Sequence, residues 1–123
     1  NENIVFEMQK NRIKFTKENL VFVARDKTGQ IVFLEKGKDD AGLKHIQNRH
    51  AMEFFEAFGV KSGNIPHYLY KVVTNGNIAD NHIEIRNGRK TVTRVYDCQG
   101  NYYILTGIGT NGFIVTARPA RKE

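Results

Sequence analysis

The sequence predicts a single α+β domain over residues 1–123. Two apolar stretches near the start predict a hairpin, two segments with helical periodicity follow, and four alternating segments separated by turn residues end the chain. Helical and strand segments grouped in this way favour helices packed on one face of an antiparallel sheet. We expect strands in residues 1–38, helices in 39–76 and a four-stranded meander in 82–119.

The first block contains three expected strands and the second contains two expected helices. RIKF (12–15), LVFVAR (20–25) and IVFLEK (31–36) are the strands, and DKTGQ joins the last two as a hairpin. The first helix is expected to begin at a cap formed by Asp39 or Asp40 and to end at Gly59, with an apolar stripe at Leu43, Ile46, Phe54 and Phe58. An asparagine followed by Ile-Pro predicts a second helix that stops at Asn75 or Gly76.

The last block reads as four strands joined by short turns. They are HIEIR (82–86), KTVTRVYD (90–97), NYYILTGI (101–108) and GFIVTAR (112–118). Asn87-Gly88 is the preferred pair for a tight type I′ turn, so the first two strands should form a hairpin.

Composition narrows the classes of function. A net charge of +6 and a pI near 9.6 favour a polyanionic partner, and residues 82–123 hold seven Lys/Arg against three Asp/Glu. Cys98 is the only cysteine, which excludes an internal disulfide and a cysteine-based zinc site. No window is apolar enough to span a membrane. The start lacks both an initiator Met and a signal peptide, so we expect a piece of a longer chain.

The stretch GLKHIQNRH carries two histidines with different settings on the first expected helix. His50 lies on the apolar stripe, whereas His45 shares another line with Arg49. On a regular helix the two rings are roughly 140° apart, which is poor geometry for one metal ion, and we expect no metal and no cofactor. One interpretation makes His50 a buried core residue and His45 a solvated one. The other makes them a general acid and base at one phosphate.

A phosphate site also needs cations and a positioning group. Lys44, Arg49 and Lys71 lie on the expected helices, and the expected sheet carries Arg86, Arg89, Lys90, Arg94 and Arg118. In the last strand, alternation places Thr116 and Arg118 on one face, opposite Val115 and Ala117. The competing interpretation is a strand-forming threonine beside a solvated arginine. TGIGTNG (106–112) opens no helix and reads as a turn, and no serine hydrolase triad is indicated.

These motifs resemble the barnase, EndoU, colicin and RelE-like (BECR) nuclease superfamily over residues 39–119. The GLKHIQNRH helix is similar to the helical motif of its phage and polymorphic-toxin branches, and TARP (116–119) resembles the Thr-Ala-Tyr-Pro ending of bacterial EndoU toxins. Carried across by position, His45, His50 and Thr116 match the motif, while Arg118 stands where those toxins have tyrosine. The resemblance implies a metal-independent RNase that forms the C-terminal toxin tip of a contact-dependent growth inhibition effector.

The resulting hypothesis is a ribonuclease toxin, with tRNA as the expected substrate and a 2′,3′-cyclic phosphate as product. His45 and His50 would move protons, Thr116 would position the phosphate, and Arg118, Arg94 or Lys90 would stabilise the transition state. The domain would be exported on a larger cell-surface effector, act in the cytoplasm of a target cell and be neutralised by an acidic immunity protein. Two rivals stay open: a non-catalytic RNA-binding module with structural histidines, and a metal-dependent DNase.

Overall fold

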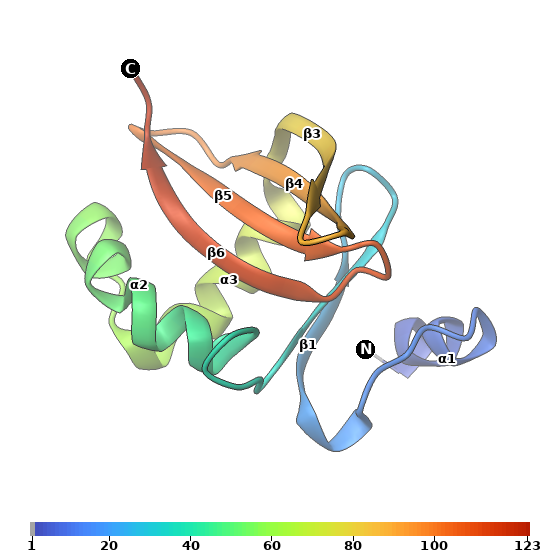
Figure 1. The fold of residues 1–123 in the computed structure, drawn as a ribbon. Coiled ribbons are helices and arrows are strands. Elements are labelled where there is room, and N and C mark those ends of the chain that lie inside the picture. Colours follow the sequence, from blue (N-terminus) through green and yellow to red (C-terminus); the bar gives the residue numbers. More distant parts are fainter. Residues whose placement is uncertain (1) are drawn as a thin grey trace.

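The computed structural model describes residues 2–123 and has the α+β arrangement that the sequence predicts. Three helices lie outside the sheets: α1 (Glu2–Lys10), α2 (Leu43–Phe58) and α3 (Ile65–Asn75). A hairpin of β1 (Leu20–Arg25) and β2 (Ile31–Glu35) precedes a four-stranded antiparallel sheet paired in chain order. Its strands are β3 (Asn77–Arg86), β4 (Arg89–Asp97), β5 (Tyr102–Gly109) and β6 (Ile114–Arg121). Figure 1 shows α3 behind this sheet, α2 beside β6, and α1 near β1 at the other end.

The first twenty residues differ from the prediction of strands. Residues 2–10 form α1, and the predicted strand 12–15 is irregular chain that starts from a left-handed Arg12 with φ of 59°. Met8 of α1 is completely buried in a small second core with Val23, Ile31 and Phe33, and Ile13 and Phe15 pack against it. A nine-residue helix is marginal by itself, so this contact with the β1–β2 hairpin holds α1.

Helix α2 begins at Leu43 without a side-chain cap, which corrects the expectation that Asp39 or Asp40 starts it. Gly42 precedes the helix with φ of 88°, a conformation that favours glycine. Its N–H donates to the carbonyl of Val115 on β6 at 2.9 Å, and the N–H of Lys44 donates to Lys36 at 2.9 Å. The start of α2 is therefore tied by backbone bonds to the last strand and to the chain that leaves β2.

The local signals for α3 and for the β3–β4 turn are confirmed. Helix α3 has its proline in the first turn and ends at Asn75, and Asn87 and Gly88 both have positive φ, as a type I′ turn requires. Strand β3 begins at Asn77, five residues before the predicted start, and β6 continues through Pro119 to Arg121. Among the described residues, no helix is both long and apolar enough to cross a membrane.

Alternation divides the four-stranded sheet into a core face and an open face. On β4 and β5 the buried residues are Val92, Arg94, Tyr96, Ile104, Thr106 and Ile108, which alternate with partly exposed ones. The core face packs against Ile46 and Phe54 of α2 and against Leu69 and Val72 of α3. The opposite face of the sheet is not covered by these side chains of α2 and α3, and it carries Thr91, Thr93 and Thr116.

Candidate functional site

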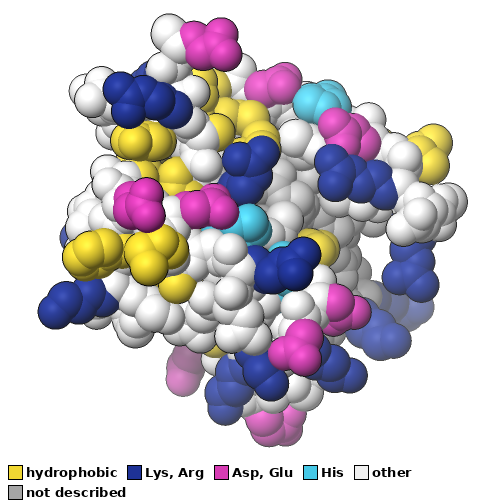
Figure 2. All heavy atoms as spheres, turned by 60° about the vertical axis from the view of Figure 1, so that its left-hand side comes forward, with side chains coloured by type: hydrophobic (Ala, Val, Ile, Leu, Met, Phe, Trp, Pro, Cys, Tyr) yellow, Lys and Arg dark blue, Asp and Glu magenta, His cyan; other side chains and the backbone are white. Residues whose placement is uncertain are grey.

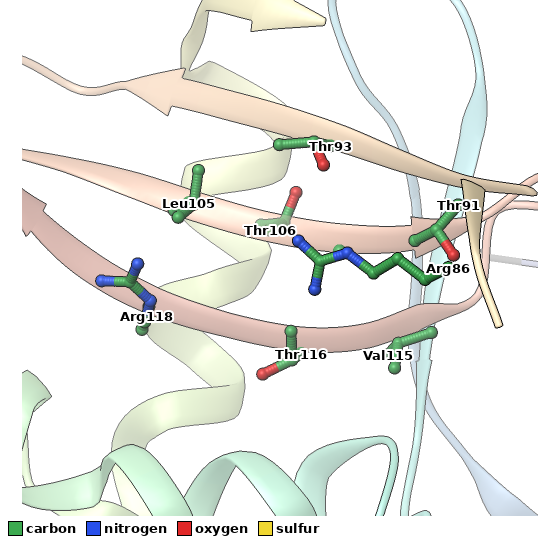
Figure 3. A pocket seen from close by; sticks show the side chains of 9 residues that line it. Arg86, Thr91, Thr93, Leu105, Thr106, Val115, Thr116 and Arg118 are labelled. Atoms are coloured by element: carbon green, nitrogen blue, oxygen red, sulfur yellow. The ribbon is translucent and has the colours of Figure 1, made fainter. Parts of the chain in front are cut away.

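The open face of the sheet is hollowed into a pocket of about 260 Å³. All four strands contribute to its lining, which consists of Arg86, Thr91, Thr93, Leu105, Thr106, Gly107, Val115, Thr116 and Arg118. Gly107 lies between Thr93 and Thr116 in the strand register, and a Cβ there would come within 3.3 Å of the Thr116 methyl. The missing side chain keeps the floor of the pocket open. Figure 3 shows Arg86 lying across the pocket while the Thr116 hydroxyl points toward α2.

His45 connects α2 to this pocket through Thr116. The His45 Nε2 lies 3.1 Å from the Thr116 Oγ1, although the two residues are 71 positions apart in the chain. The other ring nitrogen, Nδ1, lies 2.9 Å from the carbonyl oxygen of Asp39. A carbonyl only accepts, so Nδ1 carries a proton. When the ring is neutral, its Nε2 therefore keeps a lone pair that can accept from the Thr116 hydroxyl. This tautomer is the one that a general base at the pocket needs.

His50 lies against His45 instead of diverging from it. The two ring centroids are 5.9 Å apart, with an edge-to-face angle of 79°. The His50 Nδ1 lies 2.9 Å from a carboxylate oxygen of Glu53, and the side chain is 18% exposed. The expectation of rings separated by roughly 140° took only the Cα directions of a regular helix into account. Side-chain torsions bring the two imidazoles together, and neither the fully buried nor the fully solvated interpretation fits them.

Arg86 and Arg118 are the two cations that line the pocket. Arg118 lies two residues after Thr116 on the same face, as alternation predicts, while Ala117 points into the core. Val115 departs from the predicted alternation. Gly107 pairs with Thr116 and Ile108 pairs with Ile114, so Val115 is the extra residue of a β-bulge between these pairs. Its side chain lines the pocket and does not point into the core.

Arg94 corrects the expectation of a phosphate ligand on the sheet, because its side chain lies in the core and not on the open face. Its side chain is 5% exposed, and its Nη1 donates to Asp26 at 2.9 Å. The Nε of Arg94 donates to Asn81, and the Tyr96 hydroxyl donates to the same Asp26 oxygen at 2.6 Å. Alternation with Val92 and Tyr96 could have shown this, but Asp26 is 68 residues away in the chain.

The remaining predicted phosphate ligands do not line the pocket. Lys44 and Arg49 are exposed on α2, and Lys44 is 3.6 Å from Asp39. Arg89 faces Arg86 at the tip of the hairpin, whereas Lys90 pairs with Ile85 and points to the opposite face from Thr91. Lys71 lines a separate pocket with His67 and Tyr68. Figure 2 shows Lys and Arg side chains bordering the histidines, with acidic side chains among them.

The structure connects the pocket residue Arg86 to His82 and Glu84, two residues of β3 that the prediction from the sequence does not include. His82 Nε2 lies 2.9 Å from Glu84, whose other oxygen accepts from Arg86 at 2.9 Å and 3.1 Å. The hydrogen bond to Glu84 is the main cause that raises the pKa of His82. The hydrogen bonds from His82 and Arg86 lower the pKa of Glu84. Alternation along HIEIR was the signal that could have found these side chains.

Among residues 2–123, no group of three or more His, Cys, Asp and Glu side chains is placed to hold a metal ion. The histidines beside the pocket can transfer protons, and the arginine and threonine side chains that line it can bind an anion.

Comparisons with known proteins identify no family. No protein-family model matches the chain, and no curated protein matches it in sequence. The function proposed below therefore depends on the geometry of the site and on the resemblance of residues 39–119.

Proposed function

We propose that this domain is an endoribonuclease that cleaves RNA by attack of the 2′-hydroxyl on the adjacent phosphate, without a metal. One observation carries the proposal: His45 directs its Nε2 at Thr116 on the rim of a pocket that also holds Arg86 and Arg118. RNA supplies its own nucleophile next to the phosphate, so the protein has to position the substrate, move two protons and stabilise charge.

His45 is the general base of the proposed reaction. Its Nε2 takes the proton of the 2′-hydroxyl while the 2′-oxygen forms a bond to phosphorus. The carbonyl of Asp39 holds the ring in the required tautomer. Thr116, whose hydroxyl bonds to Nε2 in the free protein, turns its hydrogen bond to a phosphate oxygen when RNA occupies the pocket.

His50 is the general acid. As an imidazolium paired with Glu53, it gives the Nε2 proton to the 5′-oxygen when the bond from phosphorus to that oxygen breaks. The products are a 2′,3′-cyclic phosphate and a 5′-hydroxyl, so one proton is taken up and one released. Arg118 and Arg86 neutralise the negative charge that develops on the phosphate oxygens.

Incubation of the purified domain with total tRNA in EDTA tests this proposal. We expect cleavage that leaves cyclic phosphate ends, and a loss of about 10²–10⁴-fold in rate for His45→Ala and for His50→Ala. Thr116→Val should reduce the rate, while Thr116→Ser should keep most of it because the hydroxyl remains. His67→Ala is the matched control, since His67 lies on α3 in a different pocket.

Two outcomes would reject the proposal in different ways. Wild-type protein that binds tRNA without cutting it is an RNA-binding module with structural histidines. Cleavage that EDTA stops, with DNA as the preferred substrate, is a metal-dependent DNase.

The biological role proposed here follows from the resemblance to toxin nucleases. The domain would be the tip of a larger exported effector, act on RNA in the target-cell cytoplasm and meet an immunity protein there. Its charge of +6 favours an acidic immunity protein, because opposite charge speeds association and raises its salt dependence. Expression inside a bacterium should stop growth for the wild type and not for His45→Ala.

A further inference from the structure

The open face of β3 carries a row of alternating charge, made of Asp80, His82, Glu84 and Arg86. Each member contacts the next one. His82 Nδ1 lies 3.1 Å from Asp80 and its Nε2 lies 2.9 Å from Glu84. Glu84 Oε2 accepts from the Nε of Arg86 at 3.1 Å and from its Nη2 at 2.9 Å. Three consecutive contacts therefore lead along the strand from Asp80 to an arginine that lines the pocket.

The strand register places this row on the open face of the sheet, along the edge strand farthest from β6, and its last member, Arg86, lines the pocket. His82 pairs with Thr93, Thr93 with Gly107, and Gly107 with Thr116, so one line across the sheet leads from His82 to the partner of His45. Glu84 pairs with Thr91, which lines the pocket with Thr93. Ile83 and Ile85 point away from this face.

Arg86 needs a support of this kind because little else restrains it. It stands next to the Asn87-Gly88 turn, and its side chain is 72% exposed. Without Glu84, the long side chain would sample many rotamers in solvent. The two bonds to Glu84 use two of the five guanidinium N–H groups and leave three for an anion.

We propose that Glu84 is a positioning residue of the nuclease, which holds Arg86 over the pocket beside Thr116, and that His82 in turn holds Glu84. This inference rests on the proposed function for its catalytic consequence. Its structural part, an arginine fixed for anion binding, is tested independently of RNA cleavage.

The protonation of His82 makes this support sensitive to pH. Both ring nitrogens face carboxylates, which only accept hydrogen bonds, so the ring donates from both nitrogens as an imidazolium. Asp80 and Glu84 on β3 face the ring, and Thr93 on β4 lies opposite it in the register. When His82 loses a proton as pH rises, the ring loses its positive charge and one of its two bonds to a carboxylate, so the hydrogen bond that stays is weaker. Glu84 then loses part of its restraint, and Arg86 follows.

NMR and kinetics on the same variants test the proposal. In the wild type we expect a sharp Nε–H signal from Arg86 that shifts as His82 titrates, and this signal should broaden in Glu84→Gln. Glu84→Gln should lower kcat/KM for RNA about tenfold. In an Arg86→Gln background, the same Glu84 change should alter kcat/KM by less than about twofold, because the residue on which Glu84 acts is gone. Glu56→Gln, an exposed carboxylate change on α2, is the control for charge.

The pH dependence separates positioning from a purely structural role. The ratio of wild-type to His82→Gln activity should fall toward one as pH rises through the pKa of His82. A constant ratio, or a full Glu84 effect in the Arg86→Gln background, would overturn the proposal. If the wild type does not cleave RNA, titration with inorganic phosphate decides. Weaker phosphate binding in Glu84→Gln would support the role of Glu84 while the nuclease function fails, and unchanged binding would end both.

Discussion

The buried pair of Asp26 and Arg94 makes a quantitative prediction about stability. Asp26→Ala removes the carboxylate that accepts from the Arg94 guanidinium and from the Tyr96 hydroxyl. The two charged side chains are 0% and 5% exposed, so water cannot replace the lost partner without opening the core. The change should therefore cost far more than the loss of a surface ion pair.

The expected loss in the free energy of unfolding is about 4 kcal/mol. Breaking a buried pair by removing one partner costs roughly 3–5 kcal/mol, and an orphaned buried hydroxyl costs about 1–3 kcal/mol. The two terms share one carboxylate and do not add in full. A domain of this length unfolds with an entropy of about 0.26 kcal/mol/K, so the midpoint temperature should fall by about 15 °C.

Urea unfolding of the wild type and the variant measures the change, with unchanged m-values as the sign that unfolded states are comparable. The double variant Asp26→Asn, Arg94→Met is the matched partner. It removes both charges and leaves an amide for the Tyr96 hydroxyl, so at least half of the lost stability should return. A loss below about 1 kcal/mol for Asp26→Ala would refute this reasoning and would return Arg94 to the candidate phosphate ligands.

Three further predictions concern other parts of the molecule. Gly42→Ala should lower the unfolding free energy by more than about 1 kcal/mol, because a Cβ there would lie 2.8 Å from the Gly37 Cα. The same variant should also reduce cleavage. The control is Gly63→Ala, which has open space around it and should be nearly neutral in urea unfolding. Burial raises the pKa of Tyr96, so the folded state holds the hydroxyl proton more tightly than the unfolded chain does. The free energy of unfolding should therefore fall as pH rises above about 10. Tyr96→Phe should flatten this decline, which urea midpoints measured across the alkaline range would show. Arg118→Gln should reduce the slope of log binding constant against log salt by about 0.7 if Arg118 contacts a phosphate of single-stranded RNA, and fluorescence titration of a labelled oligonucleotide at several salt concentrations measures it.

Much of the fold could be predicted because its signals are local. The Asn87-Gly88 turn, the Pro66 start of α3 and the alternation along β4 each depend on neighbours in the chain. Helix α1 could not be predicted in this way, since its stability comes from burying Met8 against β1 and β2. The start of α2 was also missed, because a backbone bond from Gly42 to Val115 sets it in place of a capping side chain.

In the candidate site, too, local patterns predict some features and long-range contacts determine the others. Thr116 and Arg118 could be placed on one face by alternation, and the structure puts both beside the pocket. The contact between His45 and Thr116 depends on how α2 lies against β6, which no local pattern reveals. The charge of Arg94 predicts a surface residue, whereas its alternation with Val92 and Tyr96 correctly indicates the core.

The contact between His45 and the last strand has a consequence for synthesis. A ribosome releases the chain from the N-terminus, so both histidines leave it long before Thr116 does. A chain interrupted before β6 would contain all of α2 with its two histidines. It would still lack Thr116, Arg118 and one wall of the pocket. If the proposed function is correct, unfinished copies lack a complete site and should not cleave RNA. An inhibitor that blocks the site would then be needed only after β6 has joined the sheet.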